Sequence, residues 1–257
     1  MRLPAFIRLT IRNILVNVDL GTLSFLLGLP ALYLFVLGLM FQGIVPGIDL
    51  SGHVESYTAF LAPGIVGMQT LTSGNIGGGL LWSDRRWGMF EQLMVGPFRR
   101  SDYLMGIVLV SVFFSLGGSL IMMGLAAELG VHLYFSMLST LVFITSLVAG
   151  TILFSSLFLI ISVFAKTMQA YNTITIVLFF FLDFASTSFY PVTQSTPFWL
   201  RMISAGNPLS YICNSIRDAL LGSGMGSAPI SLAVIVAIMA VLFGISVRIY
   251  SRIRPGS

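Results

Sequence analysis

The stretch WSDRRWGMFEQLMVGPFRR, at 82–100, carries the charged and aromatic residues of this sequence that are best suited to binding a partner. It holds four of the 13 basic residues and two of the nine acidic ones, and apolar segments flank it on both sides. On a helical wheel one face is apolar: Trp87, Met89, Phe90, Leu93 and Met94. The opposite face is polar: Asp84, Arg85, Glu91 and Gln92. This pattern predicts an amphipathic helix within 83–100, capped by Ser83 or Asp84 and ended by Gly96–Pro97. A solvated loop is the alternative, but a loop needs no ordered apolar face.

Motifs for enzymatic chemistry do not occur in the sequence. A phosphate-binding loop before Lys166, the only lysine, would need glycines where Ile160 and Ala165 stand. The patterns H-E-x-x-H, C-x-x-C and G-x-S-x-G are also missing, and His53 and His132 are isolated. We therefore expect a protein that is not an enzyme and binds no cofactor or metal of its own.

Asp183, in TITIVLFFFLDFASTSFYP, is the most informative isolated charge. It lies about twelve residues into an apolar segment, well inside a membrane if that segment spans one. A carboxyl group is costly there and should face a bundle interior, a polar cavity or a partner. It either lines a translocation route or is satisfied by hydroxyl groups or the outer interface.

The composition predicts that a lipid bilayer surrounds most of the protein. Hydrophobic residues make up 56% of the 257, charged residues only 9%, and the mean hydropathy is +0.97. A soluble domain carries about 25% charged residues. Six segments reach the length of about 20 mostly apolar residues that a spanning helix needs: Leu20–Phe41, Tyr57–Leu81, Tyr103–Ala127, Tyr134–Phe164, Tyr171–Tyr190 and Ala228–Val247. We expect an all-α integral membrane protein, one domain over 1–257 with six transmembrane helices. The single cysteine, Cys213, excludes an internal disulfide.

We attribute the net charge of +4 to the orientation of the chain in the membrane and not to nucleic-acid binding. With six spans, only Arg201 and Arg217 lie on the side opposite the two termini, and the other basic residues lie on the termini's side. The positive-inside rule then predicts cytoplasmic termini in a multi-pass protein of the cell (plasma or inner) membrane.

The N-terminal segment, residues 1–19, lacks the pattern of a cleaved signal peptide, because Arg8 and Arg12 interrupt it. These arginines share one helical face, and apolar residues share another: Ile7, Ile11, Ile14, Leu15 and Val18. The pattern predicts a helix lying in the membrane interface. A plain extension of the first span is the alternative.

The inner end of the second span is crowded with small residues: Gly74, Asn75, Gly77, Gly78 and Gly79. Small residues at this density let helices approach closely or permit a break, and close packing is the favoured interpretation.

The connection between the fifth and sixth spans, 191–227, is irregular. Thr196–Pro197 and Asn207–Pro208 each read as an N-cap followed by proline at the first helical position. Apolar residues then recur at helical spacing, and Gly222 suits a helix C-terminus. We expect two short helices, either re-entrant and covered by protein or lying on the outer surface.

Two motifs in this layout resemble the type-2 family of ABC-transporter permeases. The inner match comprises Arg86, Gly88, Glu91, Leu93 and Pro97. Met89–Phe90 depart from it, because the family usually has a small residue before the glutamate. The outer match, within 189–220, comprises Pro191, Pro197, Trp199, Asn207, Pro208 and Arg217. The resemblance covers essentially the whole chain.

The resemblance implies the membrane subunit of an ATP-driven exporter. Its partners would be two cytoplasmic ABC ATPase subunits, which bind the ATP and Mg²⁺, and a second permease chain, most simply in a homodimer. A coupling helix within 83–100 would engage the ATPase through Asp84, Arg85, Arg86, Gly88, Glu91, Gln92 and Pro97. The translocation path or outer gate would include Asp183, Tyr190, Pro191, Asn207, Pro208 and Arg217.

The expected substrate is amphipathic, drug-like or lipidic, although the family also moves polysaccharides, lipo-oligosaccharides and ions. The phenylalanine-rich fifth span suits apolar cargo, yet lipid-facing phenylalanine explains it equally. A transporter driven by an ion gradient would need several charged sites at mid-membrane, and only Asp183 is so placed. A membrane-embedded enzyme would need clustered catalytic residues, which the sequence lacks.

Overall fold

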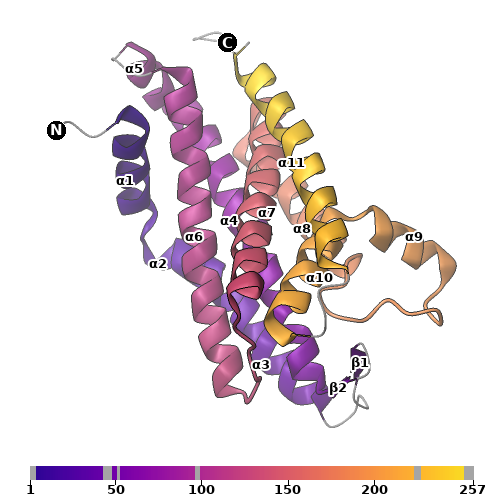
Figure 1. Cartoon of the computed structure of the whole chain (residues 1–257). Helices are drawn as coiled ribbons and strands as arrows, with labels where there is room; N and C mark the ends of the chain where they lie inside the picture. The colour runs from indigo at the N-terminus through magenta and orange to yellow at the C-terminus, as the bar shows by residue number, and fades with distance from the viewer. Residues whose placement is uncertain (1–3, 43–47, 51–52, 96–98, 223–226, 252–257) are drawn as a thin grey trace.

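The computed structural model describes residues 4–42, 48–50, 53–95, 99–222 and 227–251, most of them helical (Figure 1). In chain order the helices are α1 (Ala5–Asn17), α2 (Leu20–Leu23), the π-helix η1 (Ser24–Gly28), α3 (Leu29–Gln42), α4 (Tyr57–Arg86), α5 (Met89–Val95), α6 (Arg100–Glu128), α7 (Met137–Phe164), α8 (Met168–Phe184), α9 (Phe198–Gly206), α10 (Pro208–Leu221) and α11 (Ala228–Ser251). Between α3 and α4, the strands β1 (Ile48–Leu50) and β2 (His53–Glu55) form an antiparallel hairpin with Ile48 opposite Glu55. The predicted helical class is confirmed, and the hairpin is an addition to it.

Four of the described helical segments are long and apolar enough to cross a membrane: Leu20–Phe41, Arg100–Glu128, Met137–Phe164 and Ala228–Tyr250. The other two predicted spans coincide with α4, which has the length but is less apolar, and with α8, which is apolar but has 17 residues. These segments make the chain a multi-pass membrane protein.

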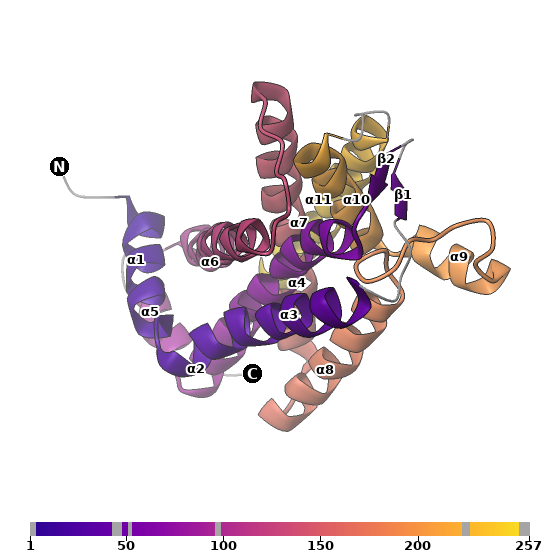
Figure 2. The same cartoon turned by 90° about the horizontal axis from the view of Figure 1, so that it is seen from below.

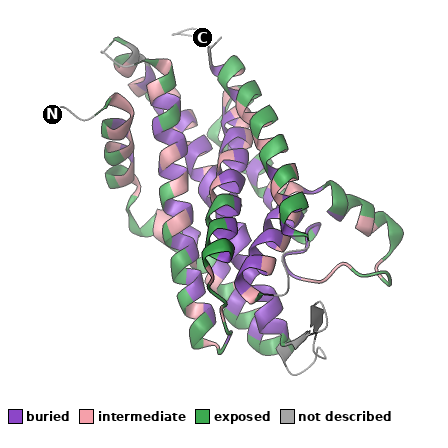
Figure 3. Cartoon of the chain, in the orientation of Figure 1, coloured by how far each residue is buried: buried purple, intermediate pink, exposed green. Residues whose placement is uncertain are grey.

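Helix α4 is the central helix of the bundle. It packs against α3, α6, α7 and α10, and every residue from Tyr57 to Gly74 is buried (Figure 3). Several polar side chains along it therefore bond to protein and not to lipid, as when the Gln69 amide donates to Leu26 O at 3.2 Å. A helix enclosed by other helices needs no apolar exterior, which explains why α4 is less apolar than its neighbours.

The glycines of α4 allow close packing, and the helix continues through them without a break. A Cβ atom on Gly77 would lie 2.6 Å from Ser111 Oγ on α6 and 2.8 Å from Ser155 Oγ on α7. A Cβ atom on Gly79, by contrast, would meet nothing within 4 Å. The packing interpretation of the glycine cluster is therefore confirmed.

We expect Gly77→Ala to destabilise the bundle by about 1–3 kcal/mol, because the added methyl group overpacks the α4–α6–α7 contact. The matched control, Gly79→Ala, should leave stability unchanged or raise it by up to about 1 kcal/mol, since alanine favours helix over glycine. Unfolding of the purified protein in detergent, followed by circular dichroism, measures both. Equal stabilities for the two variants would contradict the packing role of Gly77.

Helix α1 packs on α6. Leu9 and Asn13 are buried against the bundle, and the Thr10 hydroxyl lies 3.3 Å from Gly106 O. Its other face presents exposed apolar side chains, among them Ile11 and Leu15. The helix is thus attached to the bundle and still offers an apolar face to its surroundings.

The two helices of the 191–227 segment differ in burial. α10 is enclosed by α4, α7 and α11, whereas α9 projects from the bundle with exposed apolar residues (Figures 1 and 3). Asn207 caps α10, Pro208 occupies its first turn and Gly222 ends it with φ of 64°, as predicted. The predicted N-cap of α9, Thr196, is displaced by one residue. α9 begins at Phe198 after Pro197, and the Thr196 hydroxyl accepts from Thr193 N instead.

Candidate functional site

The predicted coupling segment, 83–100, is divided by a turn. Residues 83–86 form the last turn of α4, Gly88 has φ of 71°, and the short helix α5 begins at Met89. Positive φ is readily adopted by glycine, so Gly88 allows the chain to change direction between the two helices. The wheel assumed one continuous helix and therefore placed Trp87 beside Phe90. In the structure Trp87 is 79% exposed, and that part of the prediction is wrong.

Phe90 anchors α5 in an aromatic socket. Its side chain is 1% exposed, and its ring meets those of Tyr103 on α6 and Tyr250 on α11 edge-on, at centroid distances of 5.6 and 5.8 Å. Tyr103 and Tyr250 stack on each other at 6.0 Å. Buried residues of α1, α4 and α7, including Leu9, Leu81 and Leu159, complete the cluster. Through this cluster, α5 joins side chains from five other helices, with Phe90 as its buried member.

Asp84 faces the bundle and not the solvent. Its carboxylate accepts a hydrogen bond of 2.7 Å from the Tyr103 hydroxyl, and Arg12 of α1 lies 3.8 Å away. Asp84 lies beyond the predicted span Tyr57–Leu81. Burial raises the pKa of its carboxyl group, while the Tyr103 hydrogen bond and Arg12 act to lower it. The carboxylate therefore holds α1, α4 and α6 together at this end.

Arg85 and Trp82 tie the end of α4 to the end of α7. Arg85 Nη1 donates to Val163 O at 3.2 Å, and Trp82 Nε1 donates to Ala165 O at 3.1 Å. Like Asp84, Arg85 is therefore engaged within the chain.

The surface of the α4–α5 turn that faces away from the bundle is available to a partner. Arg86, Trp87, Gln92 and Val95 are exposed there. Glu91 lies on α5, and Pro97 lies outside the described residues. The turn therefore combines an anchored aromatic side with an exposed side of mixed chemistry.

At the opposite end of the bundle, Arg217 of α10 is buried and fully engaged. Its guanidinium group donates to Phe60 O at 3.2 Å, to Thr187 O at 2.8 Å and to Asn214 Oδ1 at 2.9 Å. It also lies 3.9 Å from the centroid of the Phe60 ring. Arg217 thus joins α10 to α4 and to the segment that follows α8.

The start of α10 is fastened to the end of α8. The Asn207 side chain accepts from Leu209 N at 3.0 Å and donates to Leu182 O at 2.7 Å. Tyr190 and Pro191 follow α8 outside any helix, and the Tyr190 hydroxyl bonds to Phe184 O. The fifth span was predicted to reach Tyr190, but α8 ends at Phe184. The chain then turns inward, where Ser186 and Ser188 are buried.

Asp183 lines a cavity of about 310 Å³ between α8, α4 and the first span. Figure 2 shows α3 and α8 diverging on the same side of α4. The Asp183 side chain is 4% exposed. The cavity is bounded mainly by aromatic and amide side chains, which include Phe25, Tyr33, Asn75 and Phe179.

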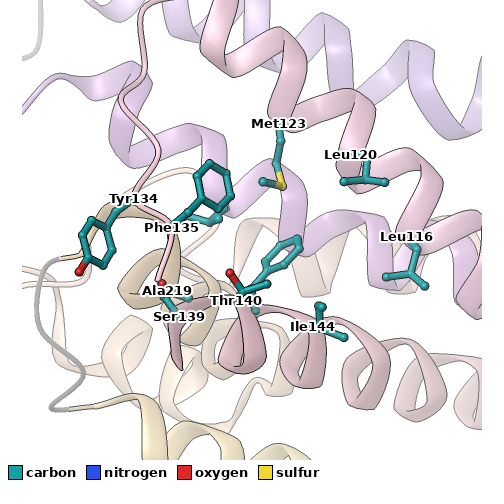
Figure 4. Close-up of a pocket in the computed structure, with 11 residues that line it drawn as sticks. Leu116, Leu120, Met123, Tyr134, Phe135, Ser139, Thr140, Ile144 and Ala219 are labelled. Atoms are coloured by element: carbon teal, nitrogen blue, oxygen red, sulfur yellow. The ribbon is translucent and has the colours of Figure 1, made fainter. Parts of the chain in front are cut away.

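A second cavity, of about 240 Å³, lies between α6, α7 and the end of α10 (Figure 4). Leu116, Leu120 and Met123 of α6 face Tyr134 and Ile144 across it. None of the described residues that line it is charged. It therefore lacks the groups needed to recognise a charged ligand.

Comparison with known proteins identifies the family. The family described as "ABC-2 type transporter" matches residues 5–221. The chain belongs to the ABC-2 type transporter family. It is also 28% identical over 199 residues to "Putative transport permease ycf38" of Cyanophora paradoxa. That match covers 73% of this chain and 64% of the relative, so the chain spans somewhat less than two thirds of the relative's length.

The family match extends over most of the chain, from residue 5 to residue 221. The match includes both the α4–α5 turn and α10.

Three residues that hold this end of the bundle together were not predicted as site residues from the sequence. Tyr103, Tyr250 and Arg12 contact Phe90 or Asp84 from helices distant in the sequence. Tyrosine at the ends of apolar segments was a usable signal, since such residues are enriched at membrane interfaces. Nothing in the sequence indicated that these tyrosines contact one another.

Proposed function

We propose that this ABC-2 permease is the membrane subunit of an exporter in which a separate ABC ATPase supplies the energy. The observation that carries the proposal is the anchored α4–α5 turn. On one side of the turn the Phe90 side chain is buried, and on the other the Trp87 side chain is 79% exposed. A helix held rigidly to the bundle and open to a partner is suited to transmitting motion. In this role Arg86, Trp87 and Gln92 contact the ATPase, as does Glu91.

The coupling residues divide into two groups under this proposal. Asp84 and Arg85 hold the turn in place, because their side chains bond to Tyr103 and Val163 O. The exposed residues of the turn bind the cleft of the ATPase, with Gly88 setting the direction of α5. Pro97 keeps its predicted place at the end of the coupling segment.

The proposed topology has six spans: α2 to α3, α4, α6, α7, α8 and α11. The burial of α4 supports counting it as a span, because its polar residues are covered by protein. The start of α1, α5 and the end of α11 lie at the same end of the bundle (Figure 1), and most basic residues are found there. This arrangement supports cytoplasmic termini in the cell membrane.

Helix α10 is proposed as a re-entrant helix and α9 as a helix of the outer interface. α10 is enclosed by three spans, which covers its polar ends, as a helix that enters a bilayer without crossing it requires. Arg217, Asn207 and Pro208, with Tyr190 and Pro191, then form the outer gate. Movement of α4 reaches this gate through the bond between Arg217 and Phe60 O.

The proposed assembly has two copies of the permease and two ATPase subunits, which hold the ATP and Mg²⁺. The proposed substrate is amphipathic, and polysaccharide or lipo-oligosaccharide export is the alternative within the same class.

Co-expression with an ABC ATPase, co-purification and vanadate-sensitive transport into proteoliposomes test the proposal. Transport driven by a proton gradient, without any ATPase, would overturn it in favour of an ion-gradient transporter.

We expect Glu91→Ala to weaken ATPase binding about tenfold, because one charge-assisted hydrogen bond contributes about 1.5 kcal/mol. ATP-driven transport should fall in parallel, while the unfolding temperature of the permease stays unchanged. Binding is measured by titrating the purified ATPase onto the permease in nanodiscs. Glu128→Ala, which removes an exposed carboxylate at the far end of α6, is the control. Normal ATPase binding and transport by Glu91→Ala would contradict the role of Glu91.

A further inference from the structure

The cavity beside Asp183 has the chemistry of a ligand site. One face of α8 provides Asn172, Thr175, Phe179 and Asp183, at helical spacings of three, seven and eleven residues. The first span provides aromatic rings on the other side, including Tyr33. Polar groups on one wall and rings on the other would suit a molecule with both a charged and an apolar part.

Asp183 has no partner within the described part of the chain. Its Oδ1 atom is buried and makes no hydrogen bond there. Arg217, the buried cation of α10, is occupied by Phe60 O, Thr187 O and Asn214. A carboxylate removed from water without a partner is costly, so a ligand that supplies positive charge at this place gains from pairing with it.

A neighbouring cavity extends the site toward the inner end of the bundle. Its volume is about 440 Å³, and it shares Phe25, Asn75 and Asn172 with the first cavity. Asp84 lies in its lining. The described residues that line the two cavities include two aspartates and no lysine or arginine. Because Asp84 is already paired with Arg12, Asp183 is the acidic group among these described lining residues that remains for a bound cation.

We propose that this cavity binds organic cations with an apolar body, with Asp183 as the counter-ion. The rings of Phe25, Tyr33 and Phe179 contribute cation–π attraction and apolar contact. An organic cation fits better than a chelated metal ion, because the described residues contain no group of three His, Cys, Asp or Glu side chains that could hold one. The inference rests on the proposed function and specifies its substrate class.

Two probes of equal shape and opposite charge test the proposal: tetraphenylphosphonium and tetraphenylborate. Binding of each to the purified full chain in nanodiscs is measured by equilibrium dialysis, with empty nanodiscs subtracted. The wild-type chain should bind the cation more tightly than the anion. Asp183→Asn should weaken cation binding at least about tenfold, because it removes the buried charge but keeps the side-chain shape. Asp183→Glu should retain most of the cation binding.

The control variant is Glu128→Gln, which removes an exposed carboxylate from the outer end of α6. It should bind both probes as the wild type does. Equal binding of cation and anion by the wild type, or unchanged cation binding in Asp183→Asn, would overturn the proposal. Binding needs no ATPase, so this failure is distinct from a failure of the exporter function, which would show as transport without any ATPase.

Discussion

Phe90→Ala should lower the free energy of unfolding by about 3–5 kcal/mol, the usual cost of truncating a fully buried phenylalanine. The ring packs edge-on against the stacked rings of Tyr103 and Tyr250, and its removal leaves a cavity where α5 meets the bundle. Under the proposed function, ATP-driven transport should fall further than stability alone explains, because α5 loses its attachment to the other helices. Unfolding in detergent and transport by proteoliposomes containing the ATPase measure the two effects.

The control for Phe90→Ala is Phe113→Ala, which truncates a phenylalanine of α6 that is 51% exposed. Its effect on stability should be small, since little packing is lost. Phe90→Leu should fall between the wild type and Phe90→Ala, because it keeps part of the buried volume. If Phe90→Ala matches Phe113→Ala in stability and transport, the socket does not anchor α5.

Arg217→Met should destabilise the chain by at least about 3 kcal/mol, because buried acceptors lose the cation that donates to them. Methionine keeps part of the side-chain volume but cannot donate to Thr187 O or Phe60 O. Arg217→Lys should restore only part of the loss, since one ammonium group cannot reproduce the fork of the guanidinium group. Stability in detergent, and the yield of folded protein, measure the loss.

Lys166→Met is the matched control for Arg217→Met, because it removes an exposed positive charge from the α7–α8 connection. Its stability should equal that of the wild type within about 0.5 kcal/mol. If Arg217→Met behaves like this control, the hydrogen bonds of Arg217 do not hold α10 in the bundle. A stable variant with altered transport would leave Arg217 as a gate residue without a structural role.

Local patterns in the sequence were sufficient to predict several elements. The apolar segments anticipated the long helices, and Asn207–Pro208 and Gly222 marked both ends of α10. The glycines of α4 indicated close packing, which the structure confirms. These predictions succeeded because each depends on the preferences of neighbouring residues along one element.

Other predictions failed where one backbone angle or one contact decided the outcome. The helical wheel over 83–100 required a continuous helix, and the positive φ of Gly88 rotated Trp87 away from Phe90. The fifth span was drawn to Tyr190, but the chain turns inward after Phe184 and buries its serines instead.

The sequence by itself determined that this is a helical membrane protein with a charged turn between two apolar segments and an isolated carboxyl group in a third. Hydropathy, charge bias and capping residues act locally, so they can be read along one chain. Only the tertiary structure decided that Asp84 faces Tyr103 and Arg12, and that Arg217 is satisfied by carbonyl groups. It also decided that Asp183 lines a cavity with Tyr33. These relations join residues far apart in the sequence, and their positions depend on how the helices pack against one another.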